Sequence, residues 1–349
     1  MRIPVTSIFA AALLLATASA RAATVHVASN GVNGSGCGTS QSPCRSIGRA
    51  IANAASGDMI VVGPGVYGDL NHDGVLGQPG EEDPATFSPG CGCVLGINKD
   101  VTVLSSGGAA QTVIDGASVG ANANVLVIAS AQLGKPGKGF MVTGLSGSGS
   151  AIVVDGSPVK IMGNQVFMQG SGSGIAPVTN DGEEVLIQGN QVIFAGTGIS
   201  VSGAGKTAKQ NQLSGCAAGI VAGSGAVVSG NIITDASSFG ILVSGTPEVA
   251  GNAIYGSGSI GLAVGGTASD GAVVQKNNIF DNGQAGTMLA NCGLYNQGAA
   301  GVVATNNYWG SSAGPGSDPS DTFCNDMLGT TIWTPFATKP FKVKAPVKP

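Results

Sequence analysis

The chain repeats itself at intervals of 20 to 26 residues, and an asparagine between two short apolar runs marks each repeat, as in "VLIQGNQVIF" and "VVSGNIITDA". This asparagine recurs at Asn164, Asn190, Asn211, Asn231, Asn252 and Asn277. After four of the six, a Gly-apolar pair follows, with its apolar residue nine or ten positions on. Each repeat is therefore one small structural unit with two or three strands of three to five residues.

A unit this small cannot bury its own apolar face, so it must stack on its neighbours. Helices do not fit the repeat, because its apolar runs are short and each glycine costs a helix about 1 kcal/mol relative to alanine. A two-sheet sandwich does not fit either, because the asparagine period gives no alternating hairpins. The period predicts an all-β fold, a right-handed parallel β-helix (a solenoid) of roughly ten coils. The asparagine suits its turns, since it tolerates left-handed backbone angles and its amide can stack from coil to coil.

The open end of a solenoid exposes unpaired strand edges that need a cover. The segment "RSIGRAIANAASGD" places Ile47, Ala50, Ile51 and Ala54 on one stripe at helical spacing. We therefore expect a short capping helix at the N-terminal end of the solenoid.

The first residues, "MRIPVTSIFAAALLLATASARAATV", have the layout of a secretory signal peptide with cleavage after Ala22. No later segment offers about 18 uninterrupted apolar residues, so no membrane span is expected. After the signal peptide only Arg45 and Arg49 remain as arginines, and the full chain has a net charge of −4, which argues against a nucleic-acid partner. We expect a protein that is secreted or held at a bacterial cell surface, with the periplasm as an alternative.

Seven cysteines in an exported chain indicate disulfides. Cys37 and Cys44 bracket a short loop, and Cys292 and Cys324 would join the last coils to the segment after "NNYWG". We predict these two bridges. Cys216 is expected to face the core unpaired, whereas the pairing of Cys91 and Cys93 stays open.

Two segments resemble a known group of proteins. The opening "VHVASNGVNGSGCGTSQSPCRSIGRAIANAASGDMIVVGPGVY" looks like the first coil of bacterial right-handed parallel β-helix proteins, which are related to the pectate-lyase-like superfamily. The later "ATNNYWGSSAGPGSDPSDTFC" is similar to the segment that closes many of them. The resemblance implies the fold but no single activity, because the superfamily includes lyases, hydrolases, epimerases and adhesins.

The motifs expected of the hydrolases and epimerases of that superfamily are missing from this sequence, and no enzyme class is positively supported. In its lyases, calcium-bound acids neutralise the substrate carboxylate while a lysine or arginine removes a proton. The weak candidates for such roles are Asp181, Glu183 and Glu184 of "NDGEE" with Lys160 as the base. Asp-Gly pairs such as Asp181-Gly182 are also ordinary turn dipeptides.

A second acidic stretch, "YGDLNHDGVLGQPGEED", holds five acidic residues in a chain that is 10% charged. Its spacing matches the first half of an EF-hand-type loop, with Gly74 at the sixth place, but the twelfth place is Gly80 instead of glutamate. A turn at Pro79-Gly80 can bring one of the two following glutamates back. We predict a structural Ca²⁺ site with the ligands Asp69, Asn71, Asp73, Val75 through its carbonyl, Glu81 and Glu82. The alternative is a solvated acidic loop.

We divide the chain into a signal peptide (1–22), one β-helix domain (23–337) and a tail rich in lysine and proline (338–349). Within the domain we expect a cap and first coil (23–66), an acidic loop insertion (67–90) and a closing segment (300–337). The predicted function is extracellular recognition, most of all the binding of a polysaccharide along the flank of the solenoid. The alternatives are a calcium-dependent polysaccharide lyase and a structural or adhesive surface protein.

Overall fold

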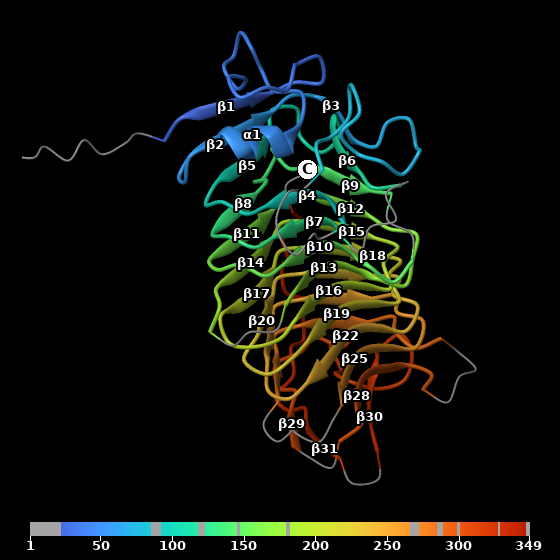
Figure 1. Ribbon diagram of the computed structural model, residues 1–349. Helices are drawn as coiled ribbons and strands as arrows, with labels where there is room; N and C mark the ends of the chain where they lie inside the picture. The colour runs from blue at the N-terminus through green and yellow to red at the C-terminus, as the bar shows by residue number, and fades with distance from the viewer. Residues whose placement is uncertain are drawn as a thin grey trace, which may run out of the picture.

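The molecule is a long solenoid built from three parallel sheets, as a computed structural model reveals (Figure 1). The predicted right-handed parallel β-helix is confirmed. The structure describes residues 22–84, 92–117, 123–144, 147–178, 182–265, 272–284, 289–298, 301–326 and 329–346. In this part of the chain, one α-helix accompanies the strands, and no helix has the length and apolar character needed to cross a membrane.

Each coil adds one strand to each of the sheets, which we name A, B and C, and neighbouring strands run parallel. Sheet A consists, in spatial order, of β1 (Thr24–Val27), β2 (Met59–Val62), β5 (Thr102–Ser105), β8 (Ala131–Leu133), β11 (Val159–Met162), β14 (Val185–Gln188), β17 (Lys206–Lys209), β20 (Val227–Ser229), β23 (Glu248–Ala250), β26 (Val273–Gln275), β29 (Gly301–Val303) and β31 (Thr330–Ile332).

Sheets B and C complete each coil. Sheet B consists of β3 (Gly65–Gly68), β6 (Thr112–Asp115), β9 (Met141–Thr143), β12 (Gln165–Phe167), β15 (Gln191–Ile193), β18 (Gln212–Ser214), β21 (Ile232–Thr234), β24 (Ala253–Tyr255) and β27 (Asn278–Phe280). Sheet C consists of β4 (Cys93–Ile97), β7 (Ala123–Val127), β10 (Ser150–Val154), β13 (Ser173–Pro177), β16 (Thr197–Val201), β19 (Ala218–Ala222), β22 (Phe239–Ser244), β25 (Ile260–Gly265), β28 (Cys292–Asn296) and β30 (Thr322–Asn325).

The core is a set of apolar columns that run along the inside of the solenoid. Side chains alternate between the two faces of a strand, so each short strand sends one or two apolar residues inward. Because the register is kept from coil to coil, each of these residues stacks on the apolar residue at the equivalent position of the next coil. One such column on sheet B contains Val166, Val192, Leu213, Ile233, Ile254 and Ile279, all fully buried.

The repeated asparagines form a continuous ladder at the turn between sheets A and B. Each backbone N–H donates to the side-chain oxygen of the asparagine one coil further on, at 2.9 Å throughout, and each side-chain amide donates to the same oxygen. The ladder continues to Asn307, and all its members are fully buried. The expectation of stacked amides is confirmed.

The left-handed backbone of this turn belongs to the residue before the asparagine, which differs from the expectation. The preceding residues have φ between 54° and 69°, namely Gly163, Gly189, Gln210, Gly230, Gly251 and Lys276. The asparagine itself stays in the ordinary region, and its N–H donates along the ladder. Glycine is frequent at the preceding position since it adopts positive φ without a steric cost.

The Gly-apolar pairs of the sequence mark the closest approach between coils on sheet C. A Cβ atom added to Gly198, Gly219 or Gly240 would lie 2.5 Å from the carbonyl oxygen of the equivalent glycine in the next coil. Only glycine therefore fits this column, and the apolar partner that follows it points into the core.

A second, shorter polar ladder lies near the C-terminal end. The Ser257 N–H donates to the side-chain oxygen of Asn282, whose own N–H and side-chain amide donate to the two carboxylate oxygens of Asp321 at 3.1 and 2.7 Å. Asp321 is 1% exposed. Burial raises the pKa of Asp321 to about 6, although the two hydrogen bonds from Asn282 lower it.

The N-terminal end is covered by α1 (Ile47–Asn53), which lies over the first coils as Figure 1 shows. Ser46 caps the helix by accepting a hydrogen bond from the Arg49 N–H at 3.2 Å. Ile47, Ala50 and Ile51 are its buried residues and make up most of the predicted stripe.

Candidate functional site

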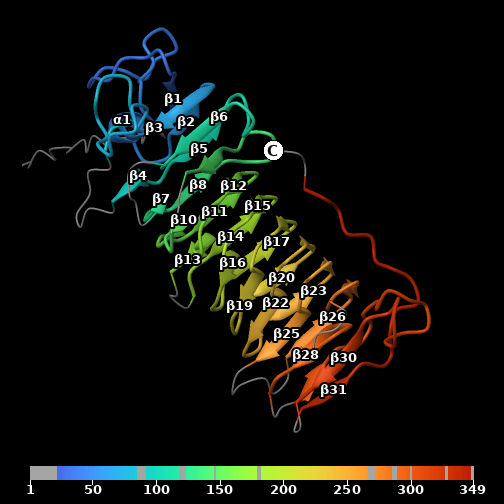
Figure 2. The same ribbon diagram turned by 90° about the vertical axis from the view of Figure 1, so that its right-hand side faces the viewer.

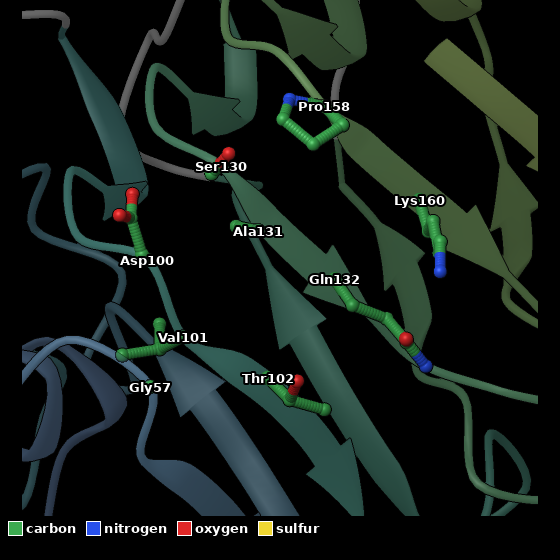
Figure 3. Close-up of a pocket in the computed structure, with 9 residues that line it drawn as sticks. All are labelled: Gly57, Asp100, Val101, Thr102, Ser130, Ala131, Gln132, Pro158 and Lys160. Carbon is green, nitrogen blue, oxygen red and sulfur yellow. The ribbon is translucent and has the colours of Figure 1, made fainter. Parts of the chain in front are cut away.

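A shallow hollow of about 240 Å³ lies on the outer face of sheet A near the N-terminal cap (Figure 3). Three neighbouring strands supply its floor: Thr102 from β5, Gln132 from β8 and Lys160 from β11. Asp100 stands at its edge, and Figure 3 shows this carboxylate and Lys160 on opposite sides. Gly57, Val101, Ser130, Ala131 and Pro158 complete the lining.

Strand alternation makes this face polar. Thr102 pairs with Gln132, and Gln132 with Lys160, so the three side chains stand side by side on the outside. The residue that follows each of them points inward and is buried, namely Val103, Leu133 and Ile161. The hollow thus rests on the packed core, which holds its floor in place.

The charged groups of the hollow are unpaired. Within the described residues, neither the Lys160 ammonium nor the Asp100 carboxylate makes a hydrogen bond or an ion pair, and both are exposed. The Gln132 amide donates to the Gly134 carbonyl at 2.8 Å, and its own oxygen faces no donor in that part of the chain. The hollow therefore offers one cation, one anion and one free amide oxygen to a ligand.

Of the weak catalytic candidates, only Lys160 lies in the hollow. Asp181 lies outside the described residues, and Glu183 and Glu184 lie in the turn before β14, the next strand of sheet A. The Glu184 N–H donates to the Ser157 hydroxyl at 3.0 Å, so this turn stacks on the one before β11. Sequence reasoning missed Asp100, Thr102 and Gln132, because their grouping depends on a register that spans three coils.

In the acidic loop after β3, many side-chain oxygens accept hydrogen bonds from backbone N–H groups of the same loop. The Asp69 carboxylate accepts hydrogen bonds from the N–H groups of His72 and Gly74 at 2.9 and 2.7 Å. Asn71 and Asp73 each accept from the N–H two residues further on, at 2.9 Å. These bonds hold three of the six predicted ligands in one tight turn, without grouping the carboxylates around a metal position.

The two glutamates after this turn go to different places. Glu81 comes back to the loop, where its carboxylate accepts from the N–H groups of Asn71 and Gln78 at 3.4 and 3.3 Å. Glu82 reaches α1 and accepts from the N–H groups of Ile47 and Gly48 at 3.0 and 2.6 Å. Burial raises the pKa of Glu82 to about 8, although these two hydrogen bonds and the positive charge of Arg45 lower it.

A salt bridge holds the same segment to the cap, with the Arg49 Nε 3.0 Å from the Asp83 carboxylate. The buried Arg45 donates to the Gly80 carbonyl and lies over the Tyr67 ring, 5.5 Å from its centroid. The end of the acidic loop is therefore built into the N-terminal cap.

Two disulfides join the predicted pairs. Cys37–Cys44 and Cys292–Cys324 have Cα–Cα distances of 4.9 and 6.0 Å. Cys93 is also disulfide-bonded, whereas Cys91 lies outside the described residues. Cys216 is buried and unpaired, as predicted, and burial raises its pKa.

Comparison with known proteins places the coils in a family. The model of the family described as "Periplasmic copper-binding protein (NosD)" matches residues 134–313, just over half of the chain. The chain belongs to the NosD family. No curated protein sequence matches it.

Solved structures share the fold of this NosD-family chain at low sequence identity. An alginate lyase from Paenibacillus sp. str. FPU-7 is 14% identical, with a TM-score of 0.51 and coverage of 90% of this chain and 99% of the lyase. The pectate lyase Pel9A is 15% identical, with a TM-score of 0.48 and coverage of 91% and 78%. A rhamnogalacturonan lyase is 12% identical, with a TM-score of 0.42 and coverage of 89% and 87%. At these identities the likeness concerns the fold.

The described residues of the NosD-matched segment do not fit a copper ion. Copper prefers imidazole, thiolate and thioether ligands, but the chain has only two histidines, His26 and His72, both before residue 134. Cys216 is buried in the core, and Met141 and Met162 lie on different sheets. Among the described residues, no three His, Cys, Asp or Glu side chains are grouped so that they could hold a metal ion.

Proposed function

We propose that this NosD-family protein is exported and binds an acidic polysaccharide on the outer face of sheet A. Export is supported by the two disulfides, which persist in oxidising compartments, and by a family described as periplasmic. Periplasmic and secreted locations both satisfy these observations.

The observation that carries the proposal is the unpaired set of polar groups in the hollow. An exposed ammonium such as that of Lys160 pairs with the carboxylate of a uronic acid, whereas Asp100 and the Gln132 oxygen accept hydrogen bonds from sugar hydroxyls. The three groups stand on a rigid sheet, so binding does not have to order them.

The affinity of a single sugar unit for this hollow is expected to be small. An exposed ion pair contributes about 0.2–1 kcal/mol, and each hydrogen bond exchanges water for ligand at about 1 kcal/mol. Useful affinity therefore requires a polymer that contacts several coils at once. Sheet A suits this, because its strands succeed one another about every 4.8 Å along the solenoid.

Binding of polyuronates by two hollow variants and a matched control tests the proposal. Lys160→Gln and Gln132→Ala should each weaken the binding of polygalacturonate or alginate severalfold, measured by calorimetry at low salt. Lys138→Gln removes the same charge from an exposed loop outside the hollow and should bind like the unmodified protein. Equal affinities for all the variants would refute the hollow as the site.

The same samples separate the two alternatives. A polysaccharide lyase leaves an unsaturated sugar that absorbs ultraviolet light. A rise in absorbance would therefore show that the protein is a lyase and does more than bind the polymer. A structural or adhesive protein would bind none of the free polyuronates.

We also propose a structural calcium ion in the acidic loop, with oxygens from Asp69, Asn71, Asp73, Glu81 and the Val75 carbonyl. The return of Glu81 to the turn supports this ligand set, whereas Glu82 is engaged by α1. The side chains must draw together around the ion, since they are not so grouped in this structure.

Calcium should raise the melting temperature of the unmodified protein, and Asp69→Ala with Asp73→Ala should remove that effect. The control is Asp155→Asn, an exposed aspartate in a turn of the solenoid. If calorimetry detects no calcium binding, the acidic stretch is a solvated loop.

A further inference from the structure

The end of the chain turns back and runs along the outside of the solenoid. We call residues 335–346 the C-terminal strap. Figure 2 shows it leaving the last coil and returning toward the N-terminal half of the molecule. Its first part is tied to the last turn of the asparagine ladder, where Asn306 donates to the Pro335 carbonyl and the Ala337 N–H donates to the Asn307 carbonyl at 3.0 Å.

Aromatic contacts anchor this first part. Phe336 lies over Gly314 and stacks on Trp333 with 5.9 Å between the ring centroids. Trp333 in turn stacks on Phe323 of β30 at 5.8 Å. The strap therefore begins from a fixed point on the closing coil.

A side-chain clamp holds the strap further along. The Asn278 side-chain oxygen accepts from the Phe341 N–H at 2.8 Å, and its amide donates to the Phe341 carbonyl at 2.9 Å. Asn278 is the first residue of β27, directly after a ladder asparagine, so the strap crosses the corner between sheets A and B at this level. Only 4% of Asn278 is exposed.

Beyond the clamp the strap has two different sides. Phe341 and Val343 are half-buried, whereas Lys342 and Lys344 are exposed, as an extended segment on a surface requires. Lys339 before the clamp and Lys276 beside Asn278 are exposed as well. Four ammonium groups are thus presented at one corner of a protein whose net charge is negative.

We propose that the C-terminal strap is a preformed cationic strip that binds the carboxylates of a polyuronate. The inference rests on the proposed polysaccharide function and assigns it a second contact, outside the hollow. Lys342 and Lys344 are alternate, exposed residues, which lie about 7 Å apart in an extended chain, and this spacing suits charges that recur along an extended polymer. A clamped strip loses less conformational freedom on binding than a loose tail would.

The test compares two lysine pairs that carry the same charge change. Lys342→Gln with Lys344→Gln should weaken the binding of polygalacturonate about fivefold at low salt, from two exposed ion pairs, and the difference should shrink at high salt. Lys135→Gln with Lys138→Gln, in an exposed loop between β8 and β9, should leave the affinity unchanged. Neutral dextran should bind to none of the proteins.

A third variant, Asn278→Ala, leaves all the lysines in place but removes the clamp. It should weaken polygalacturonate binding about threefold, because the strap must now be ordered on binding. It should also make the strap easier for trypsin to cleave at Lys342, and the polymer should protect the unmodified strap.

The possible results separate this inference from the function on which it rests. If the strap pair binds like the unmodified protein while Lys160→Gln is weakened, the strap proposal is wrong and the hollow stands. If the strap pair is weakened and Lys160→Gln is not, the strap is the site and the hollow is wrong. No polyuronate binding by the unmodified protein, or binding of anionic lipid vesicles in its place, overturns both.

Discussion

The buried carboxylate of Asp321 should make the C-terminal coils less stable at neutral pH than at acidic pH. Burial raises its pKa from 3.8 to about 6. A raised pKa means that the native state binds the proton more tightly than the unfolded chain does. The stabilisation is fully present below pH 3.8 and is lost as the pH rises toward 6. At about 1.4 kcal/mol per pKa unit, the loss is about 3 kcal/mol.

Asp321→Asn should remove this cost because an amide has no charge to desolvate. Its oxygen can accept both hydrogen bonds from Asn282, as the ladder asparagines do with a single oxygen. Its new N–H groups need acceptors in a buried place, at a cost of about 1 kcal/mol. We therefore expect the variant to be more stable by about 2 kcal/mol at about pH 7.5 and to lose this advantage at about pH 4.

Urea unfolding at both pH values measures the difference. Hydrogen exchange of the amides in β28 and β30 adds a local readout, since the end coils of a solenoid can open separately. Asp318→Asn, at an exposed neighbour, serves as the control; it keeps Asp321 and should show the same pH dependence of stability as the unmodified protein. A variant that is less stable than the unmodified protein at neutral pH, or a difference that does not change with pH, would refute the reasoning.

Three further predictions concern the ladder, the glycine column and the cap. Asn231→Ala should destabilise the protein by about 3–5 kcal/mol in urea unfolding, because the buried Asn211 N–H and Ala208 carbonyl of the preceding coil lose the bonds that the Asn231 side chain makes with them; Gln212→Ala, on an outer face, should cost much less. Gly219→Ala should lower the free energy of unfolding by about 2–3 kcal/mol, since its Cβ would lie 2.5 Å from both the Gly240 oxygen and an Ile233 methyl group. Gly36→Ala, whose Cβ would have nothing within 4 Å, should leave the free energy of unfolding unchanged. Because the pKa of Glu82 is raised to about 8, the stabilisation from its protonation should be lost as the pH rises from 4.5 to 8; the hydrogen-exchange protection factors of the Ile47 and Gly48 amides, which correct for the intrinsic rise of exchange with pH, should fall over that range, but not in Glu82→Gln.

The parts of the fold that repeat could be predicted from the sequence. The asparagine period fixed where the coils stack, because the same turn geometry recurs at each step. The apolar stripe from Ile47 to Ala54 indicated α1, and the spacing of Cys37 and Cys44 indicated a closed loop. In each case the interacting residues are close in sequence or separated by a regular interval.

The parts that depend on irregular segments could not be predicted. Asp100, Gln132 and Lys160 meet only because the loops between β5, β8 and β11 have unequal lengths that still preserve the register. The spacing predicted Glu82 as a calcium ligand beside Glu81, but its N–H donates to the Gly68 carbonyl at the end of β3 and its carboxylate accepts from the start of α1. The clamp between Asn278 and Phe341 joins residues 63 positions apart, and no pattern in the sequence relates them.

The asparagine ladder has a consequence for how such a chain can change in length. Asn190 and Asn211 make the same contacts with the asparagine that follows each of them. Deletion of residues 191–211 would therefore place Asn190 next to Asn231 in the ladder, with the same hydrogen bonds. The chain would then pass from β14 through Asn190 directly into β18. A whole coil is thus an exchangeable module, whereas the loss of a single residue from within a strand shifts the rest of that strand by one position and turns its inward side chains out. Lengthening by duplication of such modules extends the outer faces without a change to the cap or the closing segment.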